Sequence, residues 1–383
     1  MKIDDIKAIS VIGAGDMGHG IAEVALIAGY KVYLRDIKRE FVDHGVARIH
    51  QSLEKLVAKG KVTAEHHNKI RSTLLVPCVD IGEAVRESDL VIEAIPEIMD
   101  LKKETFREMD LAAPAHTVFA SNTSTMKISD ISSVTGRPEK VLGLHYFNPA
   151  VLMNLVEVIK ADQTSEETLQ IGYEFVLKNQ KVPVKVQKDV PGFIVNRVQA
   201  PAGVLLNCLL DEKISQPEEI DAVMRKLGMP MGPYEIMDFT GLDINLNAAN
   251  YFAQEVHPDF AAGNTLTSLV EAGDLGKKSG KGLFDWSQGR PEIDQSKATD
   301  EFDPMDLVAV NANEATRIVD MGVCSFEDVD TAIINATGNP MGLIALIKNI
   351  EPGELSDRLD GLAEKFQKEI FKPTPMIKQG SYR

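Results

Sequence analysis

The feature that most constrains this 383-residue chain is a glycine loop between a short apolar run and an amphipathic helix pattern. Residues 6–12 have strand length, GAGDMGHG follows at once, and residues 17–28 carry the helix pattern. In this order Gly13 permits a tight turn, Gly15 lets the backbone approach a pyrophosphate, and Gly18 lets the helix pack on the strand. The loop predicts a dinucleotide-binding α/β fold, with cofactor-binding residues Gly13, Gly15, Asp16, Met17 and Gly18.

An acidic residue follows the second predicted strand. Residues 30–34 form that strand, and Asp36 comes about twenty residues after the glycine loop, as in dinucleotide sites. Its carboxylate would accept hydrogen bonds from a ribose 2′-hydroxyl and oppose the extra phosphate of NADP. Arg35, Lys38 and Arg39 lie beside it. The sequence therefore favours NAD without excluding NADP.

One histidine and one carboxylate stand between two apolar runs in residues 141–159, VLGLHYFNPAVLMNLVEVI. The run before His145 and the run over 152–159 both have strand character, and the Asn148-Pro149 pair breaks the chain between them. If the strands pair about this turn, Glu157 lies near His145. A carboxylate beside an imidazole fixes its tautomer and raises its proton affinity, which suits a general base. The alternative is a satisfied core histidine and a strand-edge glutamate.

Further polar residues follow the strands predicted over 74–79, 89–94 and 117–120. Carboxyl ends of parallel strands face the ligand crevice, so Glu93, Glu97 and Lys102 are expected near the cofactor. The SNTST run, residues 121–125, permits two interpretations. Its residues could cap the helix that begins near Lys127 or hydrogen-bond a substrate oxygen, and both can hold for different residues of the run.

Residues 37–71 look helical and are locally basic, with a turn predicted at Gly60. An insertion of this length before the third strand exceeds a plain crossover. Either it clamps a phosphate-bearing substrate tail, or its cations form a solvated helix face; these cations are Arg48, Lys55, Lys59 and Lys61.

The pattern becomes almost wholly helical after residue 188. Residues 211–221 resemble 320–330, and MPMGPYEIMD is echoed by NPMGLIALIK, so one helical module occurs twice. We expect an α/β domain over 1–188, helical modules over 189–286 and 304–383, and a polar linker over 287–303. Asn196, on the first of these helices, either faces the cleft or packs in the helix interior. A glycine-rich loop, GKKSGKG, adds Lys277, Lys278 and Lys281, which either reach an anionic group or are solvated.

Composition limits the kind of partner. The formal charge of −16 disfavours nucleic acid and anionic membranes. Neither a signal peptide nor an apolar run of membrane-spanning length is visible, which predicts a cytoplasmic location. Three scattered cysteines with apolar neighbours fit buried thiols in a reducing compartment, and no metal site is expected; they are Cys78, Cys208 and Cys324.

Seven motifs together resemble the L-3-hydroxyacyl-CoA dehydrogenase family: GAGDMGHG, VIEAIPE, SNTS, GLHYFNP, VEVI, PGFIVNR and GKKSGKG. The resemblance covers residues 7 to about 286, and GLHYFNP with PGFIVNR is its specific part. It implies a Rossmann-like NAD-binding domain followed by an all-α domain of two repeated helical modules. The implied activity is reversible, NAD-dependent oxidation of an (S)-3-hydroxyacyl-CoA, of short chain such as 3-hydroxybutyryl-CoA, in fatty acid metabolism (β-oxidation).

The same resemblance implies the site residues. The histidine matched by His145 takes the proton of the 3-hydroxyl, the glutamate matched by Glu157 holds that histidine, and Ser124 and Asn196 align the substrate. Other implied cofactor contacts are Glu97, Lys102, Ser124, Asn148 and Lys278, and the implied coenzyme A contacts are Ser52, Lys59 and Ser124.

The second helical copy departs from single-module relatives, which dimerise through this domain. It lacks PGFIVNR, so we expect it to support the fold, and the protein to be a homodimer or a pseudo-dimeric monomer. A functional link to an enoyl-CoA hydratase is also implied. Two alternatives stay open: a dehydrogenase of a free hydroxy acid of the gulonate or carnitine type, and a non-enzymatic, crystallin-like dinucleotide-binding protein.

Overall fold

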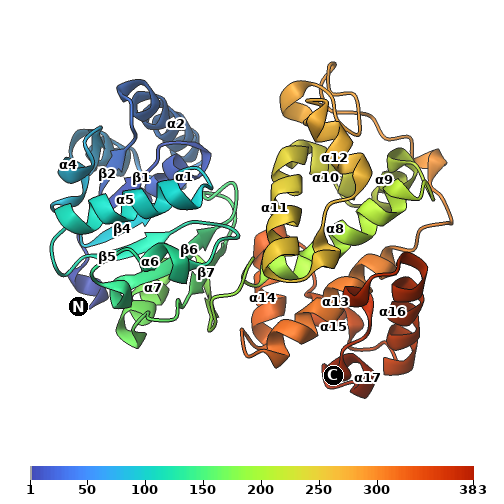
Figure 1. Cartoon of the computed structure of the whole chain (residues 1–383). Coiled ribbons are helices and arrows are strands. Elements are labelled where there is room, and N and C mark those ends of the chain that lie inside the picture. The colour runs from blue at the N-terminus through green and yellow to red at the C-terminus, as the bar shows by residue number, and fades with distance from the viewer. Residues whose placement is uncertain (1) are drawn as a thin grey trace. The chain divides into compact units, whose positions relative to one another are not determined.

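The computed structural model describes residues 2–383 and divides into two compact units. The first unit runs to Val195 and also includes Gly322–Gly342. The second comprises Asn196–Met321 and Leu343–Arg383. The first unit holds the sheet and the second is helical (Figure 1).

An eight-stranded sheet organises the first unit, in the order β3-β2-β1-β4-β5-β6-β7-β8. Neighbouring strands are parallel except for the antiparallel pair β6 and β7. The seven strands predicted above are present, as is an eighth expected from the apolar pattern over residues 182–186, although β7 begins three residues later than expected. Their bounds are Ala8–Ile12 (β1), Lys31–Arg35 (β2), Leu75–Cys78 (β3), Leu90–Glu93 (β4), Val118–Ser121 (β5), Val141–Tyr146 (β6), Leu155–Ile159 (β7) and Val182–Val186 (β8).

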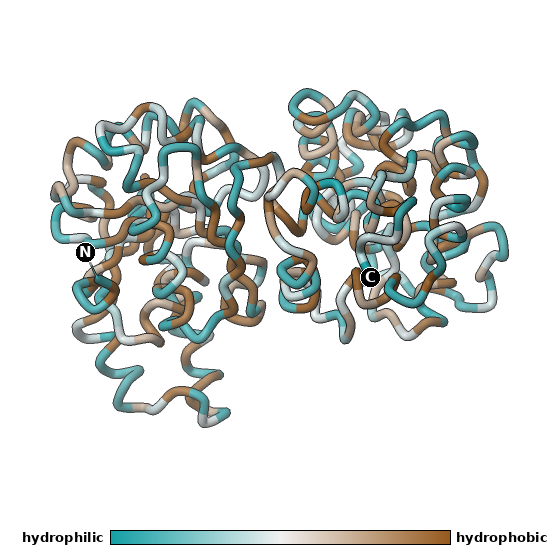
Figure 2. Tube along the Cα trace, turned by 90° about the horizontal axis from the view of Figure 1, so that it is seen from below, coloured by the Kyte–Doolittle hydropathy of each residue, from teal (hydrophilic) through white to brown (hydrophobic). Residues whose placement is uncertain are grey.

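Helices of the first unit cover both faces of this sheet. One face shares a buried core with α1 (Asp16–Ile27), α2 (Arg39–Ala58) and α7 (Glu166–Lys178). The other face packs against α5 (Met99–Ala112), where the rings of Phe106 and Phe119 lie 6.2 Å apart, and against α6 (Ile128–Ser132). In Figure 2 hydrophobic stretches run through the interior of this unit. The short helices α3 (Ala64–Lys69) and α4 (Ile81–Val85) complete it.

Side-chain alternation assigns His145 and Glu157 to one face of the sheet. Leu144 and Tyr146 belong to the core with α1 and α7, so His145 between them points to the opposite face. Val156 and Val158 place Glu157 in the same way. The two polar residues lie opposite each other in the antiparallel register.

The helical part repeats one order of elements twice, as predicted. The first copy contains α8 (Val195–Asp211), α9 (Pro217–Lys226), α10 (Pro233–Thr240), α11 (Leu242–Glu255) and α12 (Asn264–Glu271). The second contains α13 (Pro304–Asp320), α14 (Phe326–Thr337), α15 (Leu343–Ile347), α16 (Pro352–Phe366) and α17 (Pro375–Gln379). Between the copies, Lys297 pairs with Glu218 of α9 at 2.6 Å.

Each copy contains an aspartate packed closely against a glycine. A Cβ at Gly232 would lie 2.2 Å from Cγ of Asp221, and a Cβ at Gly342 would lie 2.2 Å from Cγ of Asp330. In the first copy Asp221 accepts the N–H groups of Tyr234 and Glu235 at the start of α10, at 3.0 and 2.8 Å. In both repeats the glycine of the shared Met-Gly pair is required because the aspartate leaves no room for a Cβ atom.

One part of the second copy belongs to the first unit. The segment Gly322–Gly342, which contains α14, packs against β7 and β8. The sequence pattern had indicated only that this segment repeats residues of the first copy. Within residues 2–383, every helix is too short or too polar to cross a membrane.

Replacing Gly342 by alanine should lower the melting temperature, because the new Cβ would collide with Asp330 and overpacking of this kind costs about 1–3 kcal/mol. The matched control is Gly361→Ala in α16, whose added Cβ meets no atom within 4 Å. That control should stabilise the protein by about 0.5–1 kcal/mol, since alanine is the better helix former. Thermal unfolding monitored by circular dichroism compares the two. An equal shift in both variants would contradict the steric explanation.

Candidate active site

The glycine loop at the end of β1 has the geometry that a pyrophosphate requires. Gly13 has φ +109° and its Cβ would lie 2.3 Å from the carbonyl oxygen of Ala94, while a Cβ at Gly18 would lie 1.8 Å from the oxygen of Gly13. Gly15, by contrast, faces open space, and α1 begins with the next residue. Two glycines are thus required by close backbone contacts, and the third leaves room for a phosphate at a helix N-terminus. The loop fits a bound dinucleotide.

Asp36 closes this loop from the end of β2. Its Oδ2 accepts the N–H of Ala14 at 2.8 Å, and its Oδ1 accepts the N–H of Ile37 at 2.7 Å. These bonds fix the carboxylate beside the glycine loop, where a ribose would lie. Asp16, also predicted to contact the cofactor, pairs with Arg48 of α2.

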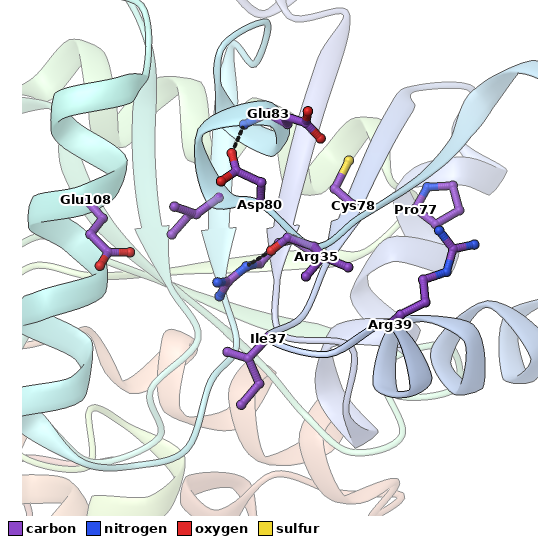
Figure 3. A pocket seen from close by; sticks show the side chains of 10 residues that line it. Arg35, Ile37, Arg39, Pro77, Cys78, Asp80, Glu83 and Glu108 are labelled. Atoms are coloured by element: carbon purple, nitrogen blue, oxygen red, sulfur yellow. Dashed lines mark hydrogen bonds between the residues drawn. The ribbon is translucent and has the colours of Figure 1, made fainter.

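A cavity of about 630 Å³ opens beyond the ends of β2 and β3 (Figure 3). Two arginines line it, and both guanidinium groups are engaged. Nε of Arg35 donates to the carbonyl of Val79 at 2.9 Å, and Nε of Arg39 donates to Asp43 at 2.8 Å. The cavity is also lined by Cys78, Asp80, Glu83 and Glu108. Its acids and its engaged arginines favour an uncharged ribose over a 2′-phosphate.

The structure brings His145 and Glu157 into direct contact. Nδ1 of His145 lies 2.6 Å from Oε2 of Glu157, and both side chains are buried, with 6% and 0% exposure. When Glu157 is ionised, Nδ1 carries the hydrogen and donates it, which leaves Nε2 with a free lone pair. This tautomer can accept a proton from a ligand.

The second oxygen of Glu157 is held by the PGFIVNR segment. Oε1 accepts the N–H groups of Ile194 and Val195 at 3.0 and 2.9 Å, at the start of α8. Gly192 and Phe193 both have positive φ, +75° and +55°, and this turn aims the two N–H groups at the carboxylate. A helix N-terminus stabilises a negative charge. The sequence had marked this segment as a change of pattern and a family motif, without indicating that its backbone binds Glu157.

The carboxylate of Glu97, after β4, binds polar groups that follow β5. The backbone N–H of Ser124 donates to Glu97 at 2.9 Å, and Thr123 also binds it. Burial opposes ionisation of Glu97, but the ammonium of Lys102 and these donors outweigh burial and hold its pKa below the usual range. The cap interpretation of SNTST was wrong, because Lys127 is the N-cap of α6 and no side chain caps it. Tertiary bonds to Glu97 take these donors instead.

Lys102 lies deeper than its predicted cofactor role suggests. Its side chain is 1% exposed, and Nζ pairs with Glu93 at 2.7 Å and with Glu97 at 3.1 Å. Burial would lower the pKa of Lys102, yet the two carboxylates raise it above the usual value. Through Glu97, Lys102 connects the buried end of β4 to Ser124.

Two contacts around His145 were not anticipated from the sequence. The side-chain oxygen of Asn122 accepts the N–H of Tyr146 at 2.8 Å and ties the SNTST run to the end of β6. The rings of Phe147 and Phe193 lie 4.4 and 5.8 Å from the imidazole. An aromatic wall of this kind lowers the local dielectric and excludes water. In the sequence, only the phenylalanines of the HYF and PGF motifs indicate this aromatic wall.

The remaining predicted residues lie elsewhere. Ser52 and Lys59 lie in the second half of α2 and at its C-cap, and Lys59 has no ion-pair partner within residues 2–383. Asn148 is exposed in the loop after β6. Asn196 follows Val195 in α8 and belongs to the second unit, as does Lys278, which pairs with Asp243.

The main polar groups of the site lie at the carboxyl ends of strands that are neighbours in the sheet: β2, β1, β4, β5 and β6. They are the Asp36 carboxylate, the glycine loop, Glu97, Ser124 and His145. A dinucleotide cradle is thus combined with an imidazole that can take a proton, held by a carboxylate. The fold and the site define a dinucleotide-dependent dehydrogenase that acts on a hydroxyl group.

Comparison with known proteins identifies the family. Residues 8–190 match the model of the 3-hydroxyacyl-CoA dehydrogenase NAD-binding domain, and residues 192–286 and 307–380 both match that of the C-terminal domain. The chain belongs to the 3-hydroxyacyl-CoA dehydrogenase family and is an NAD-dependent enzyme of that family. The double match confirms the predicted repeat.

Individual relatives agree with this assignment. The chain is 40% identical over 291 residues to a probable 3-hydroxybutyryl-CoA dehydrogenase of Bacillus subtilis, covering 74% of this chain and 99% of that protein. It is 39% identical to 3-hydroxyadipyl-CoA dehydrogenase of Escherichia coli, covering 79% of this chain and 64% of that longer protein. The structure of 3-hydroxybutyryl-CoA dehydrogenase from Escherichia coli matches with a TM-score of 0.87 and 30% identity, over 98% of both chains.

Asp36→Asn should weaken discrimination between the two dinucleotides. The amide keeps an acceptor for the N–H of Ala14 but removes the charge that opposes a 2′-phosphate, so the ratio of kcat/KM for NAD over NADP should fall about tenfold. Initial rates with each cofactor measure the ratio. Glu83→Gln removes a negative charge from the cavity beyond β2 and β3 and is the control. If both variants change the ratio equally, Asp36 does not set the preference.

Proposed function

We propose that the protein oxidises the 3-hydroxyl of a short-chain (S)-3-hydroxyacyl-CoA, such as 3-hydroxybutyryl-CoA, to the 3-ketoacyl-CoA, and runs the reverse reaction as well. The observation that carries the proposal is the buried His145–Glu157 pair, with Glu157 held at both oxygens. These contacts hold the imidazole in one orientation. It leaves one imidazole nitrogen for the substrate.

In the proposed reaction His145 is the general base. Its Nε2 accepts the proton of the 3-hydroxyl while the ionised Glu157 stabilises the resulting imidazolium. Bound NAD supplies the acceptor for the hydride that leaves C3. The phenyl rings of Phe147 and Phe193 keep water from the imidazole. In the reverse direction the imidazolium returns its proton to the carbonyl oxygen.

Ser124 and Asn196 are proposed to align the substrate's oxygen atoms. The backbone N–H of Ser124 donates to Glu97 at 2.9 Å, and this bond holds Ser124 in place. Asn196 comes directly after the residue whose N–H binds Glu157, so base and amide share one support. Both act through orientation, which contributes to rate by bringing reacting atoms to a productive distance. Glu97, Lys102, Asn148 and Lys278 are the proposed cofactor-side residues.

The α2–α3 hairpin is proposed to hold the coenzyme A moiety. Ser52 and Lys59 are seven positions apart on α2, so both lie on one side of the helix. Lys59 lacks an ion-pair partner within residues 2–383 and is available to a phosphate. An enzyme of a free hydroxy acid would have no use for that cation.

The double match to the C-terminal domain supports a pseudo-dimeric monomer, in which the second module takes the place of a partner's domain. A hydratase acting on 2-enoyl-CoA is the class of enzyme that would supply the (S)-3-hydroxyacyl thioester. We therefore propose a functional link to such a hydratase.

His145→Gln should lower kcat with 3-hydroxybutyryl-CoA about 10²- to 10⁴-fold, because the amide cannot accept the proton, while KM for NAD should stay close to wild type. Formation of NADH at 340 nm measures the rate. Glu157→Gln is the comparison: it retains the hydrogen bond but not the charge, and should fall between wild type and His145→Gln. Wild-type turnover of free 3-hydroxybutyrate instead of the thioester would move the assignment to hydroxy-acid enzymes. NAD binding without turnover of either would favour a non-enzymatic role.

Lys59→Glu should raise KM for 3-hydroxybutyryl-CoA about tenfold, since a phosphate contact becomes a repulsion, and should leave KM for NAD unchanged. The effect should shrink at high salt. Lys69→Glu, an exposed cation on α3 of the same hairpin, is the matched control and should change neither constant. Equal effects of the two substitutions would reject a specific coenzyme A contact at Lys59.

A further inference from the structure

The second helical module, residues 304–383, has no PGFIVNR segment and so offers no second site of this kind. We propose that it acts as a positioning element, which holds both the strand that carries Glu157 and the helix that carries Asn196. The inference rests on the proposed function, which assigns these two residues their roles. Two sets of contacts support it, one within each unit.

The first set lies within the first unit, at the edge of the sheet. Val323 is fully buried, and its carbonyl oxygen accepts the N–H of Gln187 at 2.8 Å. Gln187 directly follows β8, which is the edge strand, so the turn at Val323 closes that edge. Helix α14 then packs against β7 and β8. The second module thus covers the strand on which Glu157 lies.

Cys324 of the second module is buried in the same unit as Glu157. Burial raises the pKa of this thiol to about 12, and the negative charges of Asp328 and Glu157 add to the shift. The thiol is 8% exposed and stays neutral near pH 7.

The second set lies within the second unit, between α13 and α8. Nε of Arg197 donates to Oε1 of Glu314 at 2.6 Å, and the side chains are 5% and 1% exposed. Arg317 donates to the other oxygen of Glu314 at 3.0 Å. A buried ion pair of this kind is sensitive to geometry and fixes the elements that carry it. Arg197 is the neighbour of Asn196, so α13 holds α8 at the turn where the amide lies.

A second contact on α8 lies next to a proline within the helix. Pro201 lies inside α8, and the next N–H, that of Ala202, is accepted by Oδ1 of Asn311 at 3.2 Å. The first module has no polar residue at the positions equivalent to Asn311 and Glu314: alignment through Asp221 and Asp330 places Ala202 and Leu205 there. These two polar side chains therefore serve α8 and are not a requirement of the repeated fold.

The test compares Val323→Ala with Val323→Ile and with Ile377→Val, a fully buried side chain of α17 in the same module. Val323→Ala should lower kcat for 3-hydroxybutyryl-CoA about fivefold or more with KM for NAD within about twofold, because a small displacement of Glu157 slows only proton transfer. Val323→Ile, which keeps a β-branched side chain at this position, and Ile377→Val should both keep the rate close to that of the wild type. Rates are taken per folded enzyme of the full chain.

Asn311 gives an independent variant in case Val323→Ala does not fold. Asn311→Leu should lower kcat in the same pattern, whereas Asn311→Asp, which keeps an acceptor for the N–H of Ala202, should keep kcat close to that of the wild type. If both Val323→Ala and Asn311→Leu match Ile377→Val in kcat, the second module is only a scaffold and the inference fails. Absence of thioester turnover in the wild type would instead refute the proposed function, so the two failures are distinguishable.

Discussion

The buried carboxylate of Glu157 is the group on which the rest of the site depends. It has no access to water, so its charge must be balanced within the protein: His145 binds one oxygen, and the N–H groups of Ile194 and Val195 bind the other. Removing the partner of a buried charge typically costs about 3–5 kcal/mol, because the charge is left uncompensated. The same bonds that make Glu157 tolerable in the interior also orient the imidazole. Stability and chemistry are therefore imposed by one set of contacts.

The sheet explains why the other polar groups converge. Strands β2, β1, β4, β5 and β6 are parallel and adjacent, so their carboxyl ends lie along one edge. The polar groups of the site lie at or just after these ends: the Asp36 carboxylate, the glycine loop, Glu97, Ser124 and His145. Strands β7 and β8 run the other way, and the antiparallel pairing of β7 with β6 places Glu157 opposite His145. A parallel strand at that position would have needed a long crossover before it could return.

The two copies of the helical module make two kinds of contact: some are shared by both copies, and others occur in the second copy alone. The Asp–Gly contacts, Asp221 with Gly232 and Asp330 with Gly342, are the same in both copies and belong to the module itself. Asn311 and Glu314 occur in the second copy alone and bind α8 of the first. Duplication thus preserved the packing, while the two copies acquired separate tasks. The placement of α14 on β7 and β8 is part of the same division.

Much of this architecture was predictable from local pattern. Strand-length apolar runs, the glycine loop and the turn at Gly60 are short-range signals, because backbone sterics and alternation act within a few residues. The sequence by itself determined the eight strands, the dinucleotide loop, the repeat and the candidate pair His145 and Glu157. Only the tertiary structure decided that the SNTST donors bind Glu97, that Lys102 is buried between two carboxylates, that the turn after Gly192 binds Glu157, and that α14 joins the first unit. Each of these depends on which distant groups compete for the same donors and acceptors in the absence of water, and no local pattern contains that competition.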